Sequence, residues 1–363
     1  MAPNLCAPLG AGTCAGGLAA RAFVRFKHLI AVAIVATLAL SGQAAEANPR
    51  YAGLVVDARS GEVLYAFDAR EPRFPASLTK MMTLYLLFEE IEAGRLTPES
   101  ELTVSAYAAS IPPSELGVKA GETLSVEDAI LALAVKSAND VAVVVAENLE
   151  GTVAAFARRM TRTAEAIGME DTTFRNPHGL PDPAQKTTAR DMAVLGMSLH
   201  DRFPELYDVF STQTFRYGET VLRNTNGLLG QVEGMEGIKT GYTRASGFNL
   251  VSSVKRDGRH ILAVVMGGRT GASRNAHMQE LIETHLPEAC ACARTTPFLI
   301  ADTSLVNAAP LPRNRPEPPA MLAGGNQPAG RADEEMGDAA LGYAPKGRPA
   351  SEPLSAIEGV VSE

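Results

Sequence analysis

The chain has 363 residues, 46% of them hydrophobic, so it is long enough to bury one large core or two ordinary ones. Lysine and arginine number 33 against 41 aspartate and glutamate, and this mildly acidic balance argues against a nucleic-acid partner. No run of like charge is long enough to act as a binding tail.

Residues 1–47 are predicted to be a secretory signal peptide. Three basic residues, the last of them Lys27, precede an apolar run at 29–40, and an Ala-Glu-Ala site ends at Ala47. The apolar run is shorter than the roughly 20 residues that span a bilayer, although an uncleaved N-terminal anchor remains an alternative. We therefore expect the protein to be exported.

Export bears on how the cysteines are used. Cys6 and Cys14 lie within the predicted signal peptide, which leaves Cys290 and Cys292. These two are so close in sequence that an unstrained disulfide is not expected, and they are too few to hold zinc. The sequence therefore predicts a fold that depends on its hydrophobic core.

The segment 48–288 is predicted to form one α/β domain. Strand-like runs at 54–57 and 63–67 flank a hairpin signal, and a helix is expected from Ser77 to a stop near Gly94. Further helical stretches are expected at 126–135, 141–149 and 153–167, followed by strands at 248–254 and 260–266. Strands at both ends with helices between them indicate a mostly antiparallel sheet whose edges come from distant parts of the chain.

The remaining segment, 289–363, is predicted to be a disordered tail. It is rich in proline, with Gly and Ala stretches such as 322–326. No amphipathic basic helix lies at its end, so no clear C-terminal membrane anchor is expected.

The first motif that could take part in catalysis is Ser77-Leu78-Thr79-Lys80 at the start of the first predicted helix. Residues three apart share a helix face, so Ser77 and Lys80 can meet. A serine hydroxyl needs an adjacent base to become a nucleophile, and a desolvated lysine with a lowered pKa can act as that base. Alone, the pattern also fits a helix-capping serine beside a solvated lysine.

Two further motifs follow downstream. Ser137-Ala138-Asn139 interrupts an apolar stretch, which fits either an inter-helix turn or a proton relay at Ser137 with a substrate-holding amide at Asn139. Lys239-Thr240-Gly241 precedes a strand-rich stretch. Its glycine would let an extended substrate approach the backbone, while Thr240 and Lys239 would offer a hydroxyl and a positive charge to a carboxylate.

In order and spacing the three motifs resemble the signature of β-lactamases and penicillin-binding proteins. Within that group, residues 51–286 resemble the low-molecular-weight D-Ala-D-Ala carboxypeptidases, serine peptidases of family S11 that penicillin inhibits. The further stretches that carry this resemblance are Ser137–Ala142, Asn176–Leu180, Gly237–Thr243 and Met266–Thr270.

The resemblance implies a serine β-lactamase/DD-peptidase-like fold, with a mostly antiparallel five-stranded sheet flanked by helices and a helical subdomain. It implies a serine-type enzyme that removes the terminal D-Ala from peptidoglycan stem pentapeptides in the bacterial periplasm. Peptidoglycan stem peptides are the implied partners, and β-lactam antibiotics the implied covalent inhibitors. No cofactor is implied, and the histidines lack metal-ligand spacing, so no metal is expected.

The implied residue roles extend over all three motifs. Ser77 attacks the penultimate D-Ala carbonyl with Lys80 as base, and the backbone N–H groups of Ser77 and Tyr242 form the oxyanion hole. Lys239 and Thr240 engage the substrate carboxylate. Arg274 is a candidate second carboxylate contact, or else a solvated loop arginine. This chain has Thr225 in a segment where many relatives carry an arginine, which puts part of carboxylate recognition in question.

Three alternatives remain open at this point. A DD-endopeptidase would use the same acyl-enzyme. A class A β-lactamase would need a Glu-x-x-Leu-Asn motif after Asn139, where the chain has Asn176-Pro177-His178-Gly179-Leu180 instead. A cell-wall-binding protein without catalysis is disfavoured because all three motifs are intact.

His178 lies in a turn sequence and is not expected to act as a general base.

Overall fold

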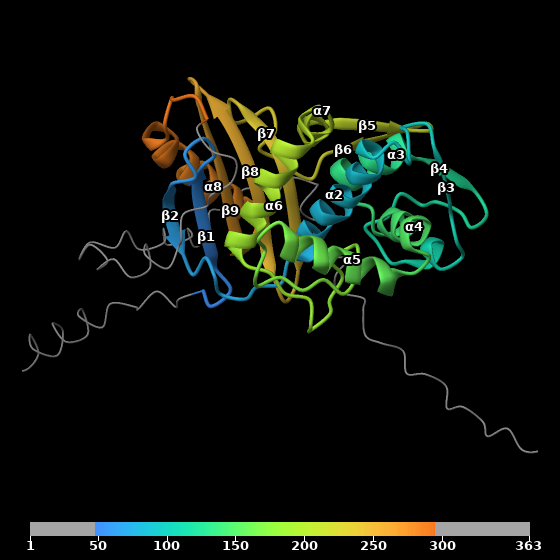
Figure 1. The fold of residues 1–363 in the computed structure, drawn as a ribbon. Coiled ribbons are helices and arrows are strands. Elements are labelled where there is room, and N and C mark those ends of the chain that lie inside the picture. Colours follow the sequence, from blue (N-terminus) through green and yellow to red (C-terminus); the bar gives the residue numbers. More distant parts are fainter. Residues whose placement is uncertain (1–47, 295–363) are drawn as a thin grey trace, which may run out of the picture. The chain divides into compact units, whose positions relative to one another are not determined.

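The structure is a computed structural model that describes residues 48–294. The predicted signal peptide and the chain from residue 295 onward lie outside these residues. The described part contains a five-stranded antiparallel sheet with the order β2-β1-β9-β8-β7 (Figure 1). The predicted fold class is therefore confirmed. The sheet strands are β1 (Ala52–Asp57), β2 (Val63–Phe67), β7 (Met235–Thr243), β8 (Gly247–Arg256) and β9 (Arg259–Gly268).

The sheet joins the two ends of the domain. Strand β1 pairs along its length with β9, with Ala52 opposite Met266 and Asp57 opposite Ile261. Consequently the edges, β2 and β7, come from distant parts of the chain, as the sequence predicted. Among residues 48–294 strand β7 pairs with β8 and with no other strand, so it forms one edge of the sheet.

Helices and two small hairpins complete the described part of the chain. The α-helices are α2 (Thr79–Glu92), α3 (Val126–Leu131), α4 (Asn139–Glu150), α5 (Val153–Ala166), α6 (Ala189–Arg202), α7 (Pro204–Tyr207) and α8 (Gly271–His285). The short turns are η1 (Ala76–Leu78), η2 (Ala108–Ser110), the π-helical η3 (Ala132–Lys136), η4 (Asp208–Ser211) and η5 (Leu286–Glu288). The hairpins pair β3 (Glu101–Thr103) with β4 (Thr123–Ser125), and β5 (Thr214–Tyr217) with β6 (Thr220–Arg223).

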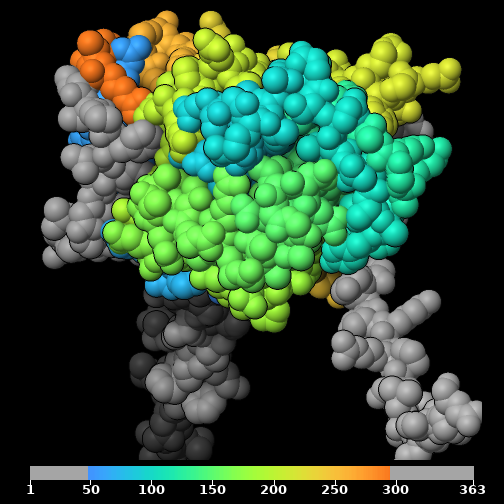
Figure 2. Space-filling view, turned by 45° about the vertical axis from the view of Figure 1, so that its right-hand side comes forward, coloured from blue at the N-terminus to red at the C-terminus, as the bar shows by residue number. Residues whose placement is uncertain are grey.

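Two hydrophobic clusters lie on opposite faces of the sheet. Because side chains alternate along a strand, Leu54 and Val56 of β1 join the larger cluster, while Val55 between them joins the smaller. The larger cluster contains the buried faces of α2, α4, α5 and α6, and the smaller contains Met278 and Ile282 of α8. Figure 2 shows the helical part that covers the larger cluster as a packed surface, coloured from cyan to green.

The structure differs from the sequence prediction in several elements. Helices α6, α7 and α8 and both small hairpins were not predicted. The helix expected at 126–135 is divided into α3 and the π-helical turn η3, which ends at Ser137 in a left-handed conformation with φ 66°. The stop expected near Gly94 is confirmed, since α2 ends at Glu92 and Gly94 has φ 66°.

The expectation that Cys290 and Cys292 stay unpaired is wrong. They form a disulfide, with their Cα atoms 5.2 Å apart. The segment that carries them packs on the domain: Ala289 belongs to the smaller core cluster, and the backbone N–H of Cys290 donates to Asp57 Oδ2 at 2.7 Å. The packed chain thus continues beyond the predicted domain boundary at residue 288.

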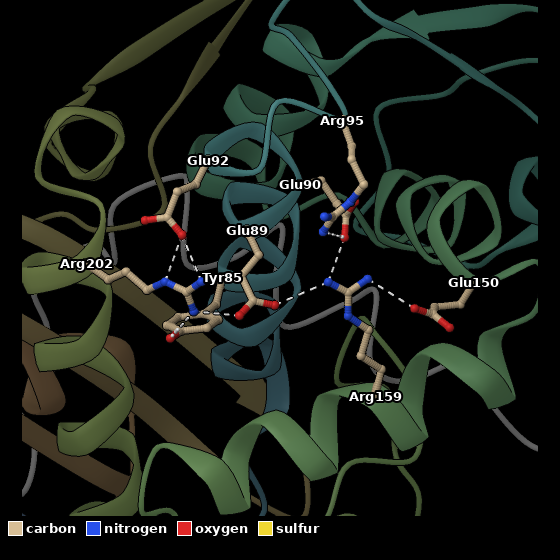
Figure 3. Close-up of polar contacts among 8 residues, drawn as sticks. All are labelled: Tyr85, Glu89, Glu90, Glu92, Arg95, Glu150, Arg159 and Arg202. Atoms are coloured by element: carbon tan, nitrogen blue, oxygen red, sulfur yellow. Dashed lines mark hydrogen bonds and ion pairs between the residues drawn. The ribbon is translucent and has the colours of Figure 1, made fainter.

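A network of ion pairs joins α2 to α5 and α6 (Figure 3). Arg159 of α5 donates to Glu90 at 2.7 Å, to Glu150 at 3.0 Å and to Glu89 at 3.2 Å, and its side chain is 18% exposed. Arg202 of α6 donates to Glu89 at 2.6 Å from the other side. Burial lowers the pKa of Arg159, but its hydrogen bonds to Glu90, Glu150 and Glu89 outweigh that effect and raise it.

Replacing Arg159 by alanine is expected to destabilise the domain by about 1–3 kcal/mol, because half-buried carboxylates lose their counter-charge. The neighbouring Arg158 is exposed, so Arg158→Ala is the matched control and should change stability by less than about 0.5 kcal/mol. Urea unfolding of both variants measures the difference.

The effect of Arg159→Ala should also depend on pH. The hydrogen bond from Arg95, followed by that from Arg159, lowers the pKa of Glu90 below its ordinary 4.5, although burial opposes the shift. A carboxylate with a depressed folded pKa stabilises the fold above its unfolded pKa and loses that contribution as the pH falls through the folded value. The Arg159→Ala and Arg158→Ala variants should therefore converge in stability as the pH falls below 4.5 through the lowered folded pKa of Glu90. If the difference in unfolding free energy between the two variants is unchanged at acid pH, charge pairing is not its origin.

Candidate active site

The first motif places Ser77 in the middle of η1, immediately before α2. The sheet fixes this turn through Asn249 of β8, whose Nδ2 donates to the backbone oxygens of Phe74 at 3.0 Å and Pro75 at 3.2 Å. Asn249 Oδ1 accepts from the Gly267 N–H at 2.9 Å, which sets the orientation of the amide. Ser77 is partly exposed and is therefore accessible to a substrate.

Lys80 lies fully buried one helical turn after Ser77, with its Nζ 3.2 Å from Ser77 Oγ. Its Nζ also donates to Asn139 Oδ1 and to the backbone oxygen of His178, both at 2.7 Å. Asn139 Nδ2 donates to the Pro112 carbonyl at 3.0 Å, which identifies its Oδ1 as an acceptor. Two of the three neighbours of the amine are thus pure acceptors.

In its neutral form the amine can point its lone pair at the serine. A neutral Nζ has two N–H donors, and the carbonyls of Asn139 and His178 accept both. The lone pair then faces the Ser77 hydroxyl, which has a proton to give. Burial, and secondarily the positive charge of Lys239, holds the pKa of Lys80 well below its usual 10.5, against the opposing influence of Asp140. The arrangement can therefore take a proton from Ser77 Oγ.

The second motif lies between η3 and α4. Ser137 has a left-handed backbone, which is strained for a residue with a side chain, and its Oγ is buried without a hydrogen-bond partner among the described residues. The adjacent Asp140 carboxylate accepts backbone N–H bonds from Leu116, Gly117 and Val118 at 2.8 to 3.4 Å. This carboxylate ties the preceding loop to the first turn of α4, and so fixes the position of Asn139.

The third motif lies on the edge strand β7. Lys239 is 1% exposed, and burial, followed by the positive charge of Arg274, lowers its pKa to about 7. Thr240 Oγ1 is 2.7 Å from Thr225 Oγ1, so the residue found in place of an arginine is hydrogen-bonded to the third motif. At Gly241 a Cβ atom would lie 2.9 Å from the Ser77 nitrogen, which shows how closely β7 approaches the serine turn.

Two other expected site residues belong to the same region. Tyr242 follows Gly241 on β7, and its ring stacks on Phe248 with centroids 4.1 Å apart. Arg274 is not a solvated loop residue, because it lies on α8 and is 1% exposed. Its Nη1 donates to the backbone oxygen of Asn249 at 2.6 Å, and its charge acts on Lys239.

Sequence reasoning missed the segment after α5 as a contributor to the site. His178 supplies its backbone oxygen to Lys80, while burial, and then the charge of Lys80, lowers the pKa of its imidazole to about 3. Gly179 packs against the serine turn so closely that a Cβ would lie 1.9 Å from the Ala76 oxygen. The turn sequence Asn-Pro-His-Gly-Leu was the available signal, but a carbonyl acceptor has no side-chain signature.

An apolar hollow of about 190 Å³ opens beside the serine turn. Its lining includes Phe74, Pro75, Ala76, Leu180 and Ala245. A cleft with mostly apolar walls beside an accessible serine is suited to hold the apolar part of a ligand.

The profile of the D-alanyl-D-alanine carboxypeptidases matches residues 42–270. The chain belongs to this family. It is 34% identical over 236 residues to the D-alanyl-D-alanine carboxypeptidase DacD of Escherichia coli K12, covering 63% of this chain and 61% of that protein. It is 30% identical over 246 residues to DacF of Bacillus subtilis, covering 65% of this chain and 62% of that protein. The chain thus matches about three fifths of the length of these carboxypeptidases.

Solved structures give the same family and fold. The carboxypeptidase DacD from Francisella tularensis superposes with a TM-score of 0.63 at 33% identity, over 65% of this chain and 70% of that one. The ampicillin-bound penicillin-binding protein D2 from Listeria monocytogenes gives 0.56 at 29% identity, over 64% of this chain and 95% of that one. Among residues 48–294, no helix of this carboxypeptidase-family chain is long and apolar enough to cross a membrane.

Proposed function

We propose that the chain is a serine-type D-alanyl-D-alanine carboxypeptidase that removes the terminal D-Ala from peptidoglycan stem pentapeptides. One observation carries the proposal: the buried Lys80 amine lies 3.2 Å from the Ser77 hydroxyl, with two carbonyl acceptors for its own N–H groups. Family membership supports the same reaction class.

In the acylation step Ser77 Oγ attacks the carbonyl carbon of the penultimate D-Ala, and its proton passes to Lys80 Nζ. The backbone N–H groups of Ser77 and Tyr242 hydrogen-bond the oxyanion that forms. The C–N bond to the last D-Ala then breaks, and the leaving amine takes up a proton. The Ser137 hydroxyl, which is buried without a partner among the described residues, relays that proton from Lys80.

Deacylation reverses the proton flow. Lys80, neutral again, takes a proton from a water molecule, whose oxygen attacks the ester carbon. The Ser77–carbon bond breaks and the serine regains its proton, so the products are a tetrapeptide and free D-Ala.

Substrate recognition is assigned to the edge strand β7 and to the second motif. An extended stem peptide would lie along β7 beside Gly241 while Asn139 holds its backbone amide. Lys239 and Thr240 bind the terminal carboxylate, and Arg274 adds positive charge behind Lys239. β-Lactams mimic this substrate, so we also propose that they acylate Ser77 and persist as inhibitors.

The cellular location is part of the proposal. The predicted signal peptide at 1–47 supports export to the periplasm, where stem peptides are found, with a catalytic domain that starts at residue 48 and includes the packed segment up to Cys290.

The proposal is tested by labelling the protein with a fluorescent penicillin, mapping the labelled peptide and assaying D-Ala release. We expect label on Ser77 and free D-Ala from a pentapeptide. Label on another residue overturns the nucleophile. Cleavage of a cross-linked dimer without release of D-Ala identifies an endopeptidase, and rapid turnover of the penicillin identifies a β-lactamase.

The assignment of Lys239 also predicts a pH dependence. Its pKa near 7 means that it carries a positive charge below that pH and loses it above. Since the charge serves carboxylate binding, kcat/KM for a pentapeptide should fall as the pH rises through about 7 to 8, mainly through KM. Bound carboxylate stabilises the charged lysine, so kcat should not fall over the same range. A kcat/KM that stays flat or rises from pH 7 to 9 contradicts this role for Lys239.

A further inference from the structure

A second cluster of chemically capable side chains lies away from the serine, at the ends of three different elements. His200 is near the end of α6, Glu236 near the start of β7 and His260 near the start of β9. One ligand atom from each lies within 4.8 Å of the other two, and the two imidazole rings have centroids 4.8 Å apart. The sheet register and the packing of α6 bring these residues together, which their sequence spacing does not suggest.

His200 already has a carboxylate partner of the kind that metal-bound imidazoles use, and His260 lies within a buried hydrogen-bond network. His200 Nδ1 is 2.9 Å from the Asp201 carboxylate, so Nδ1 is the donor and Nε2 keeps the lone pair. A carboxylate that holds a histidine in this way is the usual outer partner of a metal-bound imidazole. His260 is 5% exposed; because Ser253 Oγ donates to Glu236, His260 Nε2 donates to Ser253 Oγ in the ion-free site, and a cation would have to displace this proton.

The separations of the candidate ligand atoms suit a small cation after small movements of the side chains. His260 Nε2 and Glu236 Oε2 are 4.0 Å apart, with Ser253 Oγ 2.8 Å from the first and 3.0 Å from the second. Zinc bonds of about 2.0–2.2 Å place tetrahedral ligands roughly 3.4 Å apart, so side-chain movements of about 1 Å would complete the site. Glu236 is partly exposed, which gives an ion a path of entry.

An unpartnered polar group provides a second observation at the same place. The Tyr207 hydroxyl is buried, in a residue 3% exposed, and has no hydrogen-bond partner within 3.5 Å among the described residues. Its ring packs edge-on against His200 with centroids 5.1 Å apart, and Ser253 is the nearest hydroxyl to it. A water molecule on a bound cation would give this hydroxyl a partner.

We propose that His200, Glu236 and His260 bind a divalent first-row cation, with Zn²⁺ the best match to two imidazoles and one carboxylate. Such a ligand set disfavours Ca²⁺ and Mg²⁺, which prefer oxygen ligands. The ion would fasten α6 and β9 to β7, the strand that carries Lys239 and Thr240 further along. The proposal is independent of the peptidase assignment. It departs from the expectation of no metal, which was based on spacing along the sequence alone.

Two neighbouring positive charges oppose the ion and supply a sensitive test. Lys255 Nζ is 3.0 Å from Glu236 Oε1, and Arg294 forms an ion pair with Asp201. Removing the charge of Lys255 should therefore tighten cation binding. If the cluster is only a hydrogen-bond network, the same substitution should not produce tighter zinc binding.

The experiment measures Zn²⁺ binding by untagged protein, expressed from the full chain, in competition with a chromophoric chelator. We expect one Zn²⁺ per chain with a Kd below about 1 μM, and a Co²⁺ form with visible d–d absorption bands. Glu236→Gln and His260→Gln should weaken binding at least about 100-fold, and Lys255→Met should strengthen it several-fold. Zinc should also raise the unfolding temperature of the native protein but not that of Glu236→Gln.

His285→Gln is the matched control, because His285 pairs with Glu288 outside the cluster and its loss should leave zinc binding unchanged. Penicillin labelling reports whether each variant is folded. If His260→Gln fails to fold, Glu236→Gln and Lys255→Met still decide the question. Absence of binding below 100 μM zinc, or equal binding by Glu236→Gln and the control, overturns the site.

Discussion

Replacing Lys80 by alanine is expected to lower the rate of acylation by penicillin about 1,000-fold or more. The amine is the one basic group that the described residues place against the Ser77 hydroxyl, at 3.2 Å. General bases contribute about 10²- to 10⁴-fold, and the variant also loses the contacts that hold Asn139 in position. The second-order rate constant for a fluorescent penicillin, measured with excess reagent, gives the size of the loss.

Two further variants test whether the loss of acylation is due to the Lys80 amine itself. Lys80→Met keeps a long apolar side chain in the buried site while removing the amine, so it should lose acylation as fully as Lys80→Ala. Lys119→Ala removes a lysine whose side chain is 81% exposed and should acylate normally. Urea unfolding checks that each variant is folded. Normal acylation by either folded Lys80 variant would remove Lys80 from the role of base.

The pH profile of the native protein tests the same role without a mutation. Burial and the charge of Lys239 hold the pKa of Lys80 well below 10.5, so the neutral base should become available well below that pH. At saturating penicillin, where binding by Lys239 no longer limits the rate, the first-order acylation rate should rise with pH and level off well below pH 10.5. A rate that continues to rise up to pH 10 would indicate a lysine that is charged in the resting site.

The sequence predicted those parts of the fold that have local signals. Apolar runs with turn residues between them identified β1, β2, β8 and β9, and helical periodicity identified α2 and α5. The missed helix α6 is rich in alanine, methionine and charged residues, and only packing against the sheet shows which of its faces is buried. The pairing of β1 with β9 was foreseen only in outline, because register depends on contacts between the two ends of the domain.

In the candidate site, too, some residues could be predicted from the sequence and others could not. Ser77, Lys80 and Asn139 meet as expected, because their side chains carry the chemistry. The acceptor at His178 is a backbone oxygen, so it cannot be recognised from the residue type. The cluster of His200, Glu236 and His260 was likewise invisible in the sequence, since its members come from three separate elements. Side-chain chemistry can therefore be predicted from sequence more readily than the backbone and the distant partners that position it.

Substituting Gly179 by alanine is expected to lower acylation about 100-fold or more, although residue 179 has no reacting group. A Cβ at this position would lie 1.9 Å from the Ala76 oxygen and 2.9 Å from the Ser77 nitrogen. The serine turn must move by about 1 Å to relieve the overlap, and a displacement of that size at a reacting atom costs about 100-fold. The Ser77 N–H is also a proposed oxyanion donor, so the same movement weakens transition-state stabilisation.

Gly168→Ala separates this effect from ordinary glycine strain. Gly168 has φ +90°, close to the +91° of Gly179, but a Cβ there meets no atom within 4 Å. Both variants therefore incur the left-handed backbone cost of about 1 kcal/mol, and only Gly179→Ala adds the clash with the serine turn. We expect Gly168→Ala to acylate at the native rate. If the two variants acylate at similar rates, the close packing of Gly179 against Ala76 does not hold Ser77 in its reactive position.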